Sequence, residues 1–557
     1  MTIIEEKLNK INKLLWIVIL LTAAFNIIFL TRYNFEADSA FYVTLAQEQI
    51  RTGSLFPEGM FYSTGMFILT PNLLVIPFLF LTENLVLARQ LAILLLWFFI
   101  YFIIYKVFVV KRERNIIGFI LASSLFSILY VDASVVSMHF YQGAYVTYII
   151  FQLLFLALMN KIIVGNSYTY KSFLGILLLY VAANLGDIRN LLIWGIPGII
   201  AYVIYIYLIN GQQILETKKM LCDQKLLRIL FDGILLAFIV CLVVTRLFDT
   251  GGSMGGMSIV PAKDFGRSLH AIITGLFNLY GNSYGASLFS SGGIMKVINF
   301  FIAIFINFLL PVFAIKNINK LHFESSRFIV IFSLISTFIY LLVVFLTGSA
   351  IVEDRYLIPV YNNNILLFAA IGSYFLDNHL KKYLTAGLSF VLLYVFLSNC
   401  FYLSCQRDSL LHHKFGTFAQ GVEGVTDFLE ENELRYGYAT FFNAEEYSIL
   451  SDNKVRIRGI MFNEKEIMPY NWLTSSRFYE PDYYTGKTFL MISDTELRNF
   501  FSTGISELNL GEPCDVLKYK TFSIFVYNYN ISSRFAKGKK VYYLIRGNNS
   551  GIFIGNE

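Results

Sequence analysis

The stretch FIVIFSLISTFIYLLVVFL, residues Phe328–Leu346, contains no charged side chain. A helix of about 20 apolar residues is long enough to cross the hydrocarbon core of a bilayer. Nearly uncharged apolar runs recur along the chain, for example at Leu14–Leu30, Leu85–Tyr105, Val297–Leu310 and Tyr383–Leu397. Soluble core helices rarely run so long without charge, so the pattern predicts a polytopic membrane protein that has the lipid bilayer as a partner.

The composition of the whole chain agrees with this class. Of its 557 residues, 56% are hydrophobic and 15% are charged, whereas a soluble globular chain carries about 25% charged residues. The net charge of +6 is modest. We interpret it as loop bias that sets membrane orientation and expect no nucleic-acid partner. The five cysteines show no CxxC pair and no metal-ligand spacing.

Basic loops tend to stay in the cytoplasm. Placing every basic cluster there puts the other loops, and everything after about Tyr402, outside the cell membrane. On this basis the sequence predicts about 11 to 13 membrane spans. We expect a membrane module over residues 1–402 and a soluble extracytoplasmic α/β domain over residues 403–557. The basic clusters are Lys7–Lys13, Lys106–Arg114, Lys161–Lys171, Lys218–Arg228, Lys316–Arg327 and Lys381–Lys382.

One apolar segment, Met66–Leu81, resists this alternation because it is short and contains Pro71 and Pro77. If it crossed the membrane, the basic residues Lys111–Arg114 would fall outside. We expect a re-entrant or broken segment that lines a protein cavity, where irregular backbone is tolerated.

The tail of the chain has dispersed charge and turn residues instead of long apolar runs. Short alternating runs at Lys454–Ile460, Thr488–Ile492 and Phe522–Tyr527 predict strands, and Phe418–Leu434 and Asp494–Phe501 have helical patterns. This mixture is the basis for the predicted α/β domain.

Polar groups at or near bilayer depth are costly and are usually kept for a function. In the predicted topology, the notable ones lie together at the outer ends of hydrophobic spans. This is the layout of a site at the outer membrane–water boundary. The set comprises Glu36, Asp38, Asp132, His139, Asp187, Arg189, Glu353, Asp354 and Arg355.

The first outside loop, Asn34–Pro57, is the most informative stretch. A carboxylate follows soon after the first span, and Tyr42, Ala46 and Ile50 then recur at helical spacing. This spacing suggests an amphipathic helix lying in the membrane interface, which ends at Gly53.

The pattern Asp-x3-Tyr-x3-Ala-x3-Ile-x2-Gly-x3-Pro, which begins at Asp38, resembles the first outer loop of GT-C superfamily glycosyltransferases. Protein O-mannosyltransferases and lipid A aminoarabinose transferases are the nearer relatives in this resemblance. Asp38 matches the family's catalytic loop aspartate. Many members have Asp-Glu where this chain has Asp38-Ser39, with Glu36 upstream. This departure leaves open whether a second carboxylate or a divalent metal takes part.

Weaker likenesses extend the resemblance along the chain. Ala88-Arg89-Gln90 is similar to a family Ala-Arg-Leu element, Asp132 resembles a second-loop aspartate, and Gly186–Asn190 lies where relatives carry a basic residue. Several spans followed by an outer C-terminal α/β domain is also the family's architecture.

The resemblance implies a reaction: transfer of a sugar from a polyprenyl-phosphate donor to a glycan or lipid acceptor of the cell envelope, with inversion. Such chemistry needs an interfacial base and fixed cations for the leaving phosphate. Asp38, with Glu36, is the candidate for catalysis. The candidates for donor-phosphate binding are Arg189, Arg355, His139 and Lys263, with Arg267 and His270 as alternates. Further candidates are Tyr42, Asp132, Asp187, Glu353 and Asp354 at the site, and Tyr470 and Trp472 for acceptor binding.

Plainer interpretations remain beside these. Asp38 or Ser39 would cap the following helix. Asp187 with Arg189, and Glu353 with Arg355, would form boundary ion pairs, and the tail aromatics would be core. The rival functions are a transporter or flippase for lipid-linked saccharides, a polysaccharide polymerase or ligase, and a scaffold without activity. A transporter would be expected to show internal repeats and midplane charges, and we find no convincing repeat.

Overall fold

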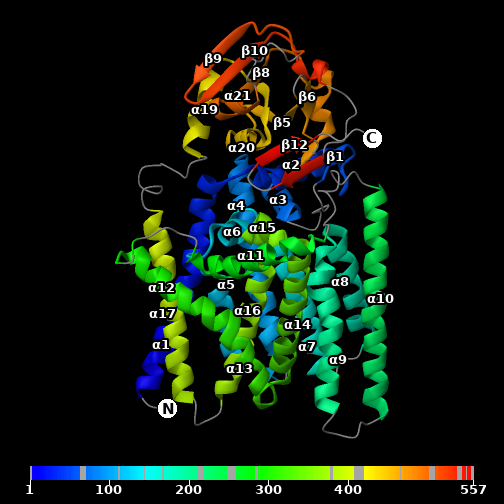
Figure 1. Cartoon of the computed structure of the whole chain (residues 1–557), viewed down its shortest axis with the longest axis vertical. Coiled ribbons are helices and arrows are strands. Elements are labelled where there is room, and N and C mark those ends of the chain that lie inside the picture. Colours follow the sequence, from blue (N-terminus) through cyan, green and yellow to red (C-terminus); the bar gives the residue numbers. More distant parts are fainter. Residues whose placement is uncertain are drawn as a thin grey trace. The chain divides into compact units, whose positions relative to one another are not determined.

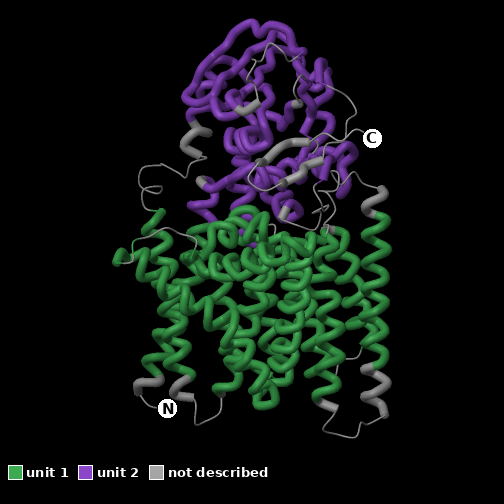
Figure 2. Tube along the Cα trace, in the orientation of Figure 1, with its two compact units in different colours: residues 1–26, 96–244, 257–406 green, residues 27–95, 245–256, 407–557 purple. Residues whose placement is uncertain are grey.

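A computed structural model describes most of the chain and divides it into two compact units, which Figure 2 colours separately. Unit 1 comprises residues 1–26, 96–244 and 257–406, and unit 2 comprises residues 27–95, 245–256 and 407–557. The described residues are 3–62, 71–110, 113–143, 145–165, 169–210, 217–247, 259–282, 287, 289–376, 381–406, 419–463, 466–470, 472–500, 509–535, 542–546 and 549–553.

Unit 1 is built from long helices that run side by side (Figure 1). Among them, α14 packs between α16 and α9, and α1 packs along α17. Most of its helices are α1 (Ile3–Phe25), α5 (Ile116–Phe126), α7 (Val146–Ile163), α8 (Tyr170–Gly186), α9 (Ile196–Asn210), α10 (Thr217–Leu247), α11 (Phe265–Phe277), α12 (Ser291–Ile304), α13 (Leu310–Asn317), α14 (Glu324–Thr347), α16 (Ile358–Ile371) and α17 (Lys381–Cys405). The helix α4 (Leu85–Phe108) belongs partly to each unit.

Eight helices in the described ranges are long and apolar enough to cross a membrane. Two shorter apolar helices, Ile116–Phe126 and Tyr170–Leu185, accompany them. The spans expose many large apolar side chains, as a lipid-facing surface requires, for example Phe98, Phe301 and Phe338. The predicted class, a helical multi-pass membrane protein with a C-terminal sheet domain, is confirmed. Together with the two shorter apolar helices, the eight long spans make ten candidate spans within the described ranges, against the predicted 11 to 13.

Unit 2 contains a six-stranded mixed sheet with the order β6-β5-β4-β8-β10-β9. The central strand β4 (Tyr436–Thr440) pairs in parallel with β5 (Arg456–Asn463) and β8 (Thr488–Ser493), and the outer pairings are antiparallel. The predicted strands at 454–460, 488–492 and 522–527 are therefore confirmed. The remaining strands of this sheet are β6 (Glu466–Pro469), β9 (Asp515–Tyr519) and β10 (Phe522–Tyr527).

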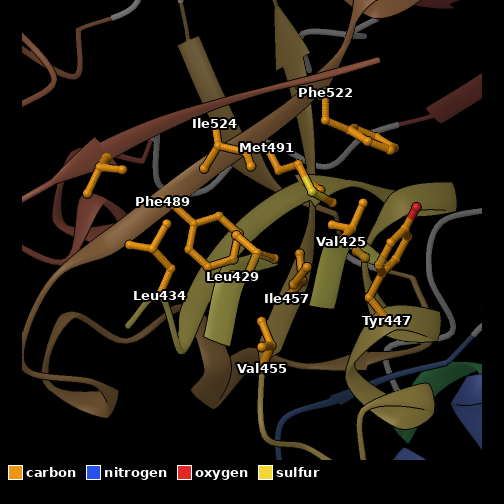
Figure 3. Close-up of a cluster of buried hydrophobic side chains, with 13 residues drawn as sticks. Val425, Leu429, Leu434, Tyr447, Val455, Ile457, Phe489, Met491, Phe522 and Ile524 are labelled. Carbon is orange, nitrogen blue, oxygen red and sulfur yellow. The ribbon is translucent and has the colours of Figure 1, made fainter. Parts of the chain in front are cut away.

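Helices pack against this sheet and contribute side chains to one of its hydrophobic clusters. Figure 3 shows Val425 and Leu429 of α19 (Ala419–Glu431) and Tyr447 of α20 (Glu445–Leu450) packed against Phe489 and Met491 of β8. The predicted helices in the tail correspond to α19 and to α21 (Asp494–Phe500). A second cluster on the sheet is aromatic and includes Tyr436, Tyr438, Phe478 and Tyr479.

The loop Asn34–Pro57, which the sequence predicts to lie outside, belongs to the same compact unit as the sheet domain. Its helix α2 (Ala37–Thr52) packs against α20, and strand β1 (Met60–Phe61) pairs with β7 (Thr474–Ser475). These contacts join segments more than 400 residues apart in the chain. The division into units therefore differs from the boundary at residue 402 that composition suggests.

The segment expected to be broken or re-entrant contains α3 (Pro71–Leu79), with Pro77 inside it. A nine-residue helix spans only about 14 Å, less than half of a bilayer core. The remainder of the expected segment, residues 66–70, lies outside the described residues. The described part is thus a short helix and not a full span.

Candidate functional site

The first group of candidate residues lies at the start of α2. Glu36 has extended backbone (φ −139°, ψ 166°) and occupies the N-cap position, but its side chain does not cap the helix. Asp38 follows in the first turn and is partly exposed. Neither Asp38 nor Ser39 occupies the N-cap, so the capping interpretation is not what the structure shows. A carboxylate in a first turn is stabilised by the helix dipole, which favours its ionised form.

The helix α2 is buried on nearly all of its faces. Tyr42 and Ala46 are buried as predicted, and so are the polar residues Thr44, Glu48 and Gln49. An amphipathic helix lying in the interface would bury only one stripe. The difference arises because α3 and elements from the C-terminal part of the chain both cover α2, contacts that the helical spacing alone does not reveal.

Tyr42 connects Asp38 to a buried arginine. The guanidinium carbon of Arg89 lies 4.8 Å from the centre of the Tyr42 ring, and Arg89 is fully buried. Burial raises the pKa of the Tyr42 phenol, Arg89 acts in the opposite direction, and Asp38 adds to the rise. The loop carboxylate and the Ala88-Arg89-Gln90 element therefore meet at one aromatic ring.

Glu48 forms the strongest link between α2 and the C-terminal part of the chain. Its carboxylate is 3% exposed and accepts hydrogen bonds from Nε of Arg477 at 2.9 and 3.0 Å. It also pairs with Arg51 at 2.8 Å. Sequence reasoning did not identify this pair, because its partners are 429 residues apart.

Replacing Arg477 with Met should loosen this link. Removing one partner of a buried ion pair leaves an uncompensated charge and costs about 3–5 kcal/mol, with Arg51 offsetting part of it here. We expect faster hydrogen exchange of the α2 amides, with α14 unchanged. Arg51→Met supplies the control. Arg51 is the more exposed of the two arginines that pair with Glu48, so its replacement should change the exchange of the α2 amides much less. Equal protection of α2 in the Arg477→Met and wild-type proteins would show that the pair does not hold α2 in place.

A further carboxylate from the C-terminal part lies near Glu36. Glu446, on α20, is 2% exposed, and its Oε1 accepts no hydrogen bond from any described residue. Burial raises the pKa of Glu446 well above its ordinary value, and Glu36 raises it further. Burial and the neighbouring carboxylate thus both favour the protonated form of Glu446. No local pattern in the sequence identifies this pair.

The second group of candidate residues lies in unit 1. Asp187 follows α8 and accepts hydrogen bonds from the Arg189 backbone N–H at 2.8 Å and from its Nε at 2.7 Å. The Tyr148 hydroxyl donates to the same carboxylate at 2.5 Å. Arg189 also lies over the Tyr148 ring, at 5.6 Å from its centre. The predicted pairing of Asp187 with Arg189 is therefore present, with a tyrosine as a third member.

Tyr145 brings the second predicted arginine to this cluster. Burial raises the pKa of Tyr145 to about 12, and the charges of Arg189 and Arg355 both act in the opposite direction. Both guanidinium groups therefore lie within electrostatic range of one phenol. Arg355 pairs with Glu353 and is 29% exposed, while Arg189 is 20% exposed. Both arginines are thus held by carboxylates and remain accessible to an anion.

Two aspartates adjoin the arginines. Asp132 is the N-cap of α6 (Ala133–Val136) and accepts from the Ser134 N–H at 2.8 Å. Asp354, in η9 (Asp354–Leu357), accepts from the Asn278 amide at 2.8 Å. Burial raises the pKa of Asp354, the bond from Asn278 lowers it, and Asp132 raises it. The predicted residues of unit 1 at positions 132, 187, 189, 353, 354 and 355 are therefore neighbours.

The two other predicted phosphate ligands have different surroundings. His139 is 1% exposed and packs among the rings of Trp97, Phe140 and Tyr361. Burial lowers its pKa to about 3, so it is neutral at pH 7 and would bind phosphate only as a hydrogen-bond donor. Lys263 is exposed in η5 (Ala262–Asp264), and the alternates Arg267 and His270 are exposed on α11.

The predicted acceptor residues lie in the sheet domain. Tyr470 is 7% exposed and packs against Phe441, with ring centres 4.9 Å apart. Trp472 is partly exposed. Tyr470 is thus placed as a core residue, and Trp472 has the accessible surface that sugar stacking needs. Within the described ranges, no group of three or more His, Cys, Asp or Glu side chains is arranged to hold a metal ion.

Comparisons with known proteins give structural likeness only. No family model and no curated protein matches the sequence. The chain is similar to the structure of ArnT from Cupriavidus metallidurans bound to undecaprenyl phosphate, with 13% identity, a TM-score of 0.49, and coverage of 94% of this chain and 99% of that one. The structure of ArnT from the same organism in the apo state has 11% identity and a TM-score of 0.41, again with coverage of 94% of this chain and 99% of that one. The structure of the Archaeoglobus fulgidus oligosaccharyltransferase in complex with zinc and sulfate has 12% identity and a TM-score of 0.38, with coverage of 92% of this chain and 73% of that one.

Proposed function

We propose that this chain is a membrane glycosyltransferase of the GT-C type. It moves a sugar from a polyprenyl-phosphate donor to a glycan or lipid of the cell envelope, on the extracytoplasmic side of the cell membrane. The observation that carries the proposal is the position of Asp38: it lies in the first turn of a buried helix that follows the first span, within electrostatic range of Tyr42, whose ring contacts Arg89. This is the loop in which the sequence resembles the family.

Asp38 acts as the base in this mechanism. The carboxylate in the first turn of α2 accepts the proton of the acceptor hydroxyl as that hydroxyl's oxygen attacks the anomeric carbon. The bond between that carbon and the donor's phosphate oxygen breaks, and its electron pair stays on the phosphate. A single displacement from the opposite side inverts the anomeric centre.

The arginines of unit 1 act on the leaving group. Phosphate gains negative charge as the glycosidic bond breaks, and guanidinium groups bind it with bidentate geometry. Asp187 and Tyr148 hold Arg189, and Glu353 holds Arg355. Groups fixed before the reaction stabilise the developing charge without reorganisation. A lipid-linked donor suits this arrangement, since its tail stays in the bilayer while its phosphosugar lies at the interface.

Sugar transfer by the purified protein tests the proposal. The protein in nanodiscs would receive a panel of radiolabelled polyprenyl-phosphate sugars with crude envelope acceptor. We expect label to pass from at least one donor to the acceptor fraction. If no donor is used, and sealed vesicles containing the protein instead carry lipid-linked saccharide across the bilayer, the chain is a transporter and the proposal is wrong.

A further inference from the structure

A buried polar network lies one helical turn from the arginine cluster of unit 1. The Gln152 amide donates to Oδ1 of Asn363 at 2.5 Å, and the Asn363 amide donates to the Ser336 hydroxyl at 2.8 Å. Ser336 donates in turn to the Ile193 carbonyl at 2.6 Å. All four residues are at most 1% exposed, so the chain of hydrogen bonds is closed to solvent.

The last acceptor of this chain, the Ile193 carbonyl, lies four residues before a proline. In an α-helix the carbonyl of Ile193 would accept from the N–H of the residue four positions later, which is Pro197. Proline has no N–H. The turn before it, η4 (Leu191–Gly195), is a π-helix, a form that is frequent at functional sites. In an apolar interior an unsatisfied carbonyl is costly, and the Ser336 hydroxyl satisfies it.

Three members of the network, Gln152, Ser336 and Ile193, each lie four positions from a residue of the arginine cluster or next to it in space, and Asn363 joins the first two. On α7, Gln152 follows Tyr148, and on α14, Ser336 precedes Tyr340, which lies within electrostatic range of Arg189 and Asp187. Ile193 follows Arg189 by the same interval. Residues four apart lie on the same face of a helix. The network therefore cross-links the three helical segments that carry the cluster.

We propose that Asn363 is a positioning residue for the donor-phosphate site. Asn363 lies on α16, accepts a hydrogen bond from Gln152 of α7 and donates one to Ser336 of α14. Ser336 in turn donates to the Ile193 carbonyl, in the segment that carries Arg189. These bonds fix where the Arg189 guanidinium points. This inference rests on the proposed function of Arg189. Asn363 touches no substrate itself: it acts through the placement of Tyr148, Tyr340 and Arg189.

Asn363→Leu tests this role, because leucine has a similar volume and makes neither bond. We expect the donor KM to rise about tenfold, since misplaced guanidinium groups weaken phosphate binding in the ground and transition states alike. A purely structural role would lower the amount of active protein and leave KM unchanged. The neighbouring Asn364 bonds Asn307 at 2.8 Å instead, so Asn364→Leu is a matched control and should change KM by less than about twofold.

A milder variant and a double mutant complete the test. Ser336→Ala breaks the last two links with little change in volume and should give the same rise in KM. In an Arg189→Gln background, Asn363→Leu should raise KM no further, because residues that act through one another are not additive. Normal KM in folded Asn363→Leu and Ser336→Ala proteins, or full additivity with Arg189→Gln, would overturn the positioning role.

Binding measurements separate this inference from the proposed function. Stabilisation of the protein by polyprenyl monophosphate reports donor-site affinity without any transfer. If wild type is stabilised and Asn363→Leu is less so, the positioning role stands even where transfer fails with every donor. If both are stabilised equally, the positioning role is wrong while sugar transfer by wild type would still support the glycosyltransferase.

Discussion

Replacing Asp38 with Asn is expected to lower the rate of sugar transfer by about 10³-fold, because a positioned general base contributes roughly 10²–10⁴. Asparagine keeps the shape of the side chain at the start of α2, but it cannot accept the acceptor's proton. Donor KM should stay near its wild-type value, since the arginines that bind phosphate are unchanged. The rate with saturating donor and acceptor is the quantity to measure.

Two further variants make this result specific. Glu58, in the same loop, is exposed, so Glu58→Gln is a matched control and should transfer sugar normally. Glu36→Gln tests the neighbouring carboxylate, which lies beside buried Glu446. If Asp38→Asn folds and transfers at the wild-type rate while Glu36→Gln does not, the base is Glu36 and the assignment of Asp38 is wrong.

Replacing Arg189 with Gln is expected to lower kcat/KM by about 10²–10³, the usual effect of removing one group that stabilises charge on a leaving oxygen. Arg189→Lys keeps the charge but loses the planar fork, and it should recover only part of the activity. Steady-state kinetics with varied donor measures both variants.

An exposed arginine provides the comparison for this second prediction. Arg228 on α10 has an 85% exposed side chain, and Arg228→Gln should retain wild-type kinetics. Folding of Arg189→Gln would be checked by size-exclusion chromatography, since the variant leaves Asp187 with only the backbone N–H of residue 189 and the Tyr148 hydroxyl among its named partners. Unchanged donor KM and kcat in a folded Arg189→Gln protein would exclude this residue from phosphate binding.

Local sequence patterns predicted the elements of this fold well. The spacing of Tyr42, Ala46 and Ile50 predicted α2, and Gly53 ends it with φ 65°, a left-handed conformation that glycine adopts readily. Apolar runs predicted the spans, and alternating runs predicted β5, β8 and β10. These features depend on residues within one or two turns of each other, so they are visible in a single sequence.

Contacts between distant segments were not predictable in the same way. The pairing of Glu48 with Arg477 and the approach of Glu446 to Glu36 join the first loop to the tail, and neither leaves a periodic signal. The sequence left open whether Tyr470 binds an acceptor or belongs to the core of the tail domain, and the structure buries it against Phe441. Composition shows that aromatic side chains are present but not which of them the sheet buries.

The cluster of charged residues in unit 1 could be predicted only in part. The positive-inside rule placed Asp187, Arg189, Glu353 and Arg355 at one boundary. The structure brings Asp187, Arg189 and Arg355 around Tyr145, and Glu353 pairs with Arg355. The role of Tyr145 and Tyr148 was hidden, since 36 tyrosines occur in the chain and most face lipid, core or interface. Sequence position thus identified the charged groups, while the side chains that hold them required three-dimensional packing.

The most direct test of the central claim is the fate of the donor lipid. Wild-type protein in nanodiscs, supplied with a polyprenyl-phosphate sugar and envelope acceptor, should release one polyprenyl monophosphate for each sugar that reaches the acceptor. Mass spectrometry of the lipid fraction measures the lipid, and radiolabel measures the sugar. Recovery of the donor intact, with label moved only across a sealed bilayer, would contradict the account and identify a transporter.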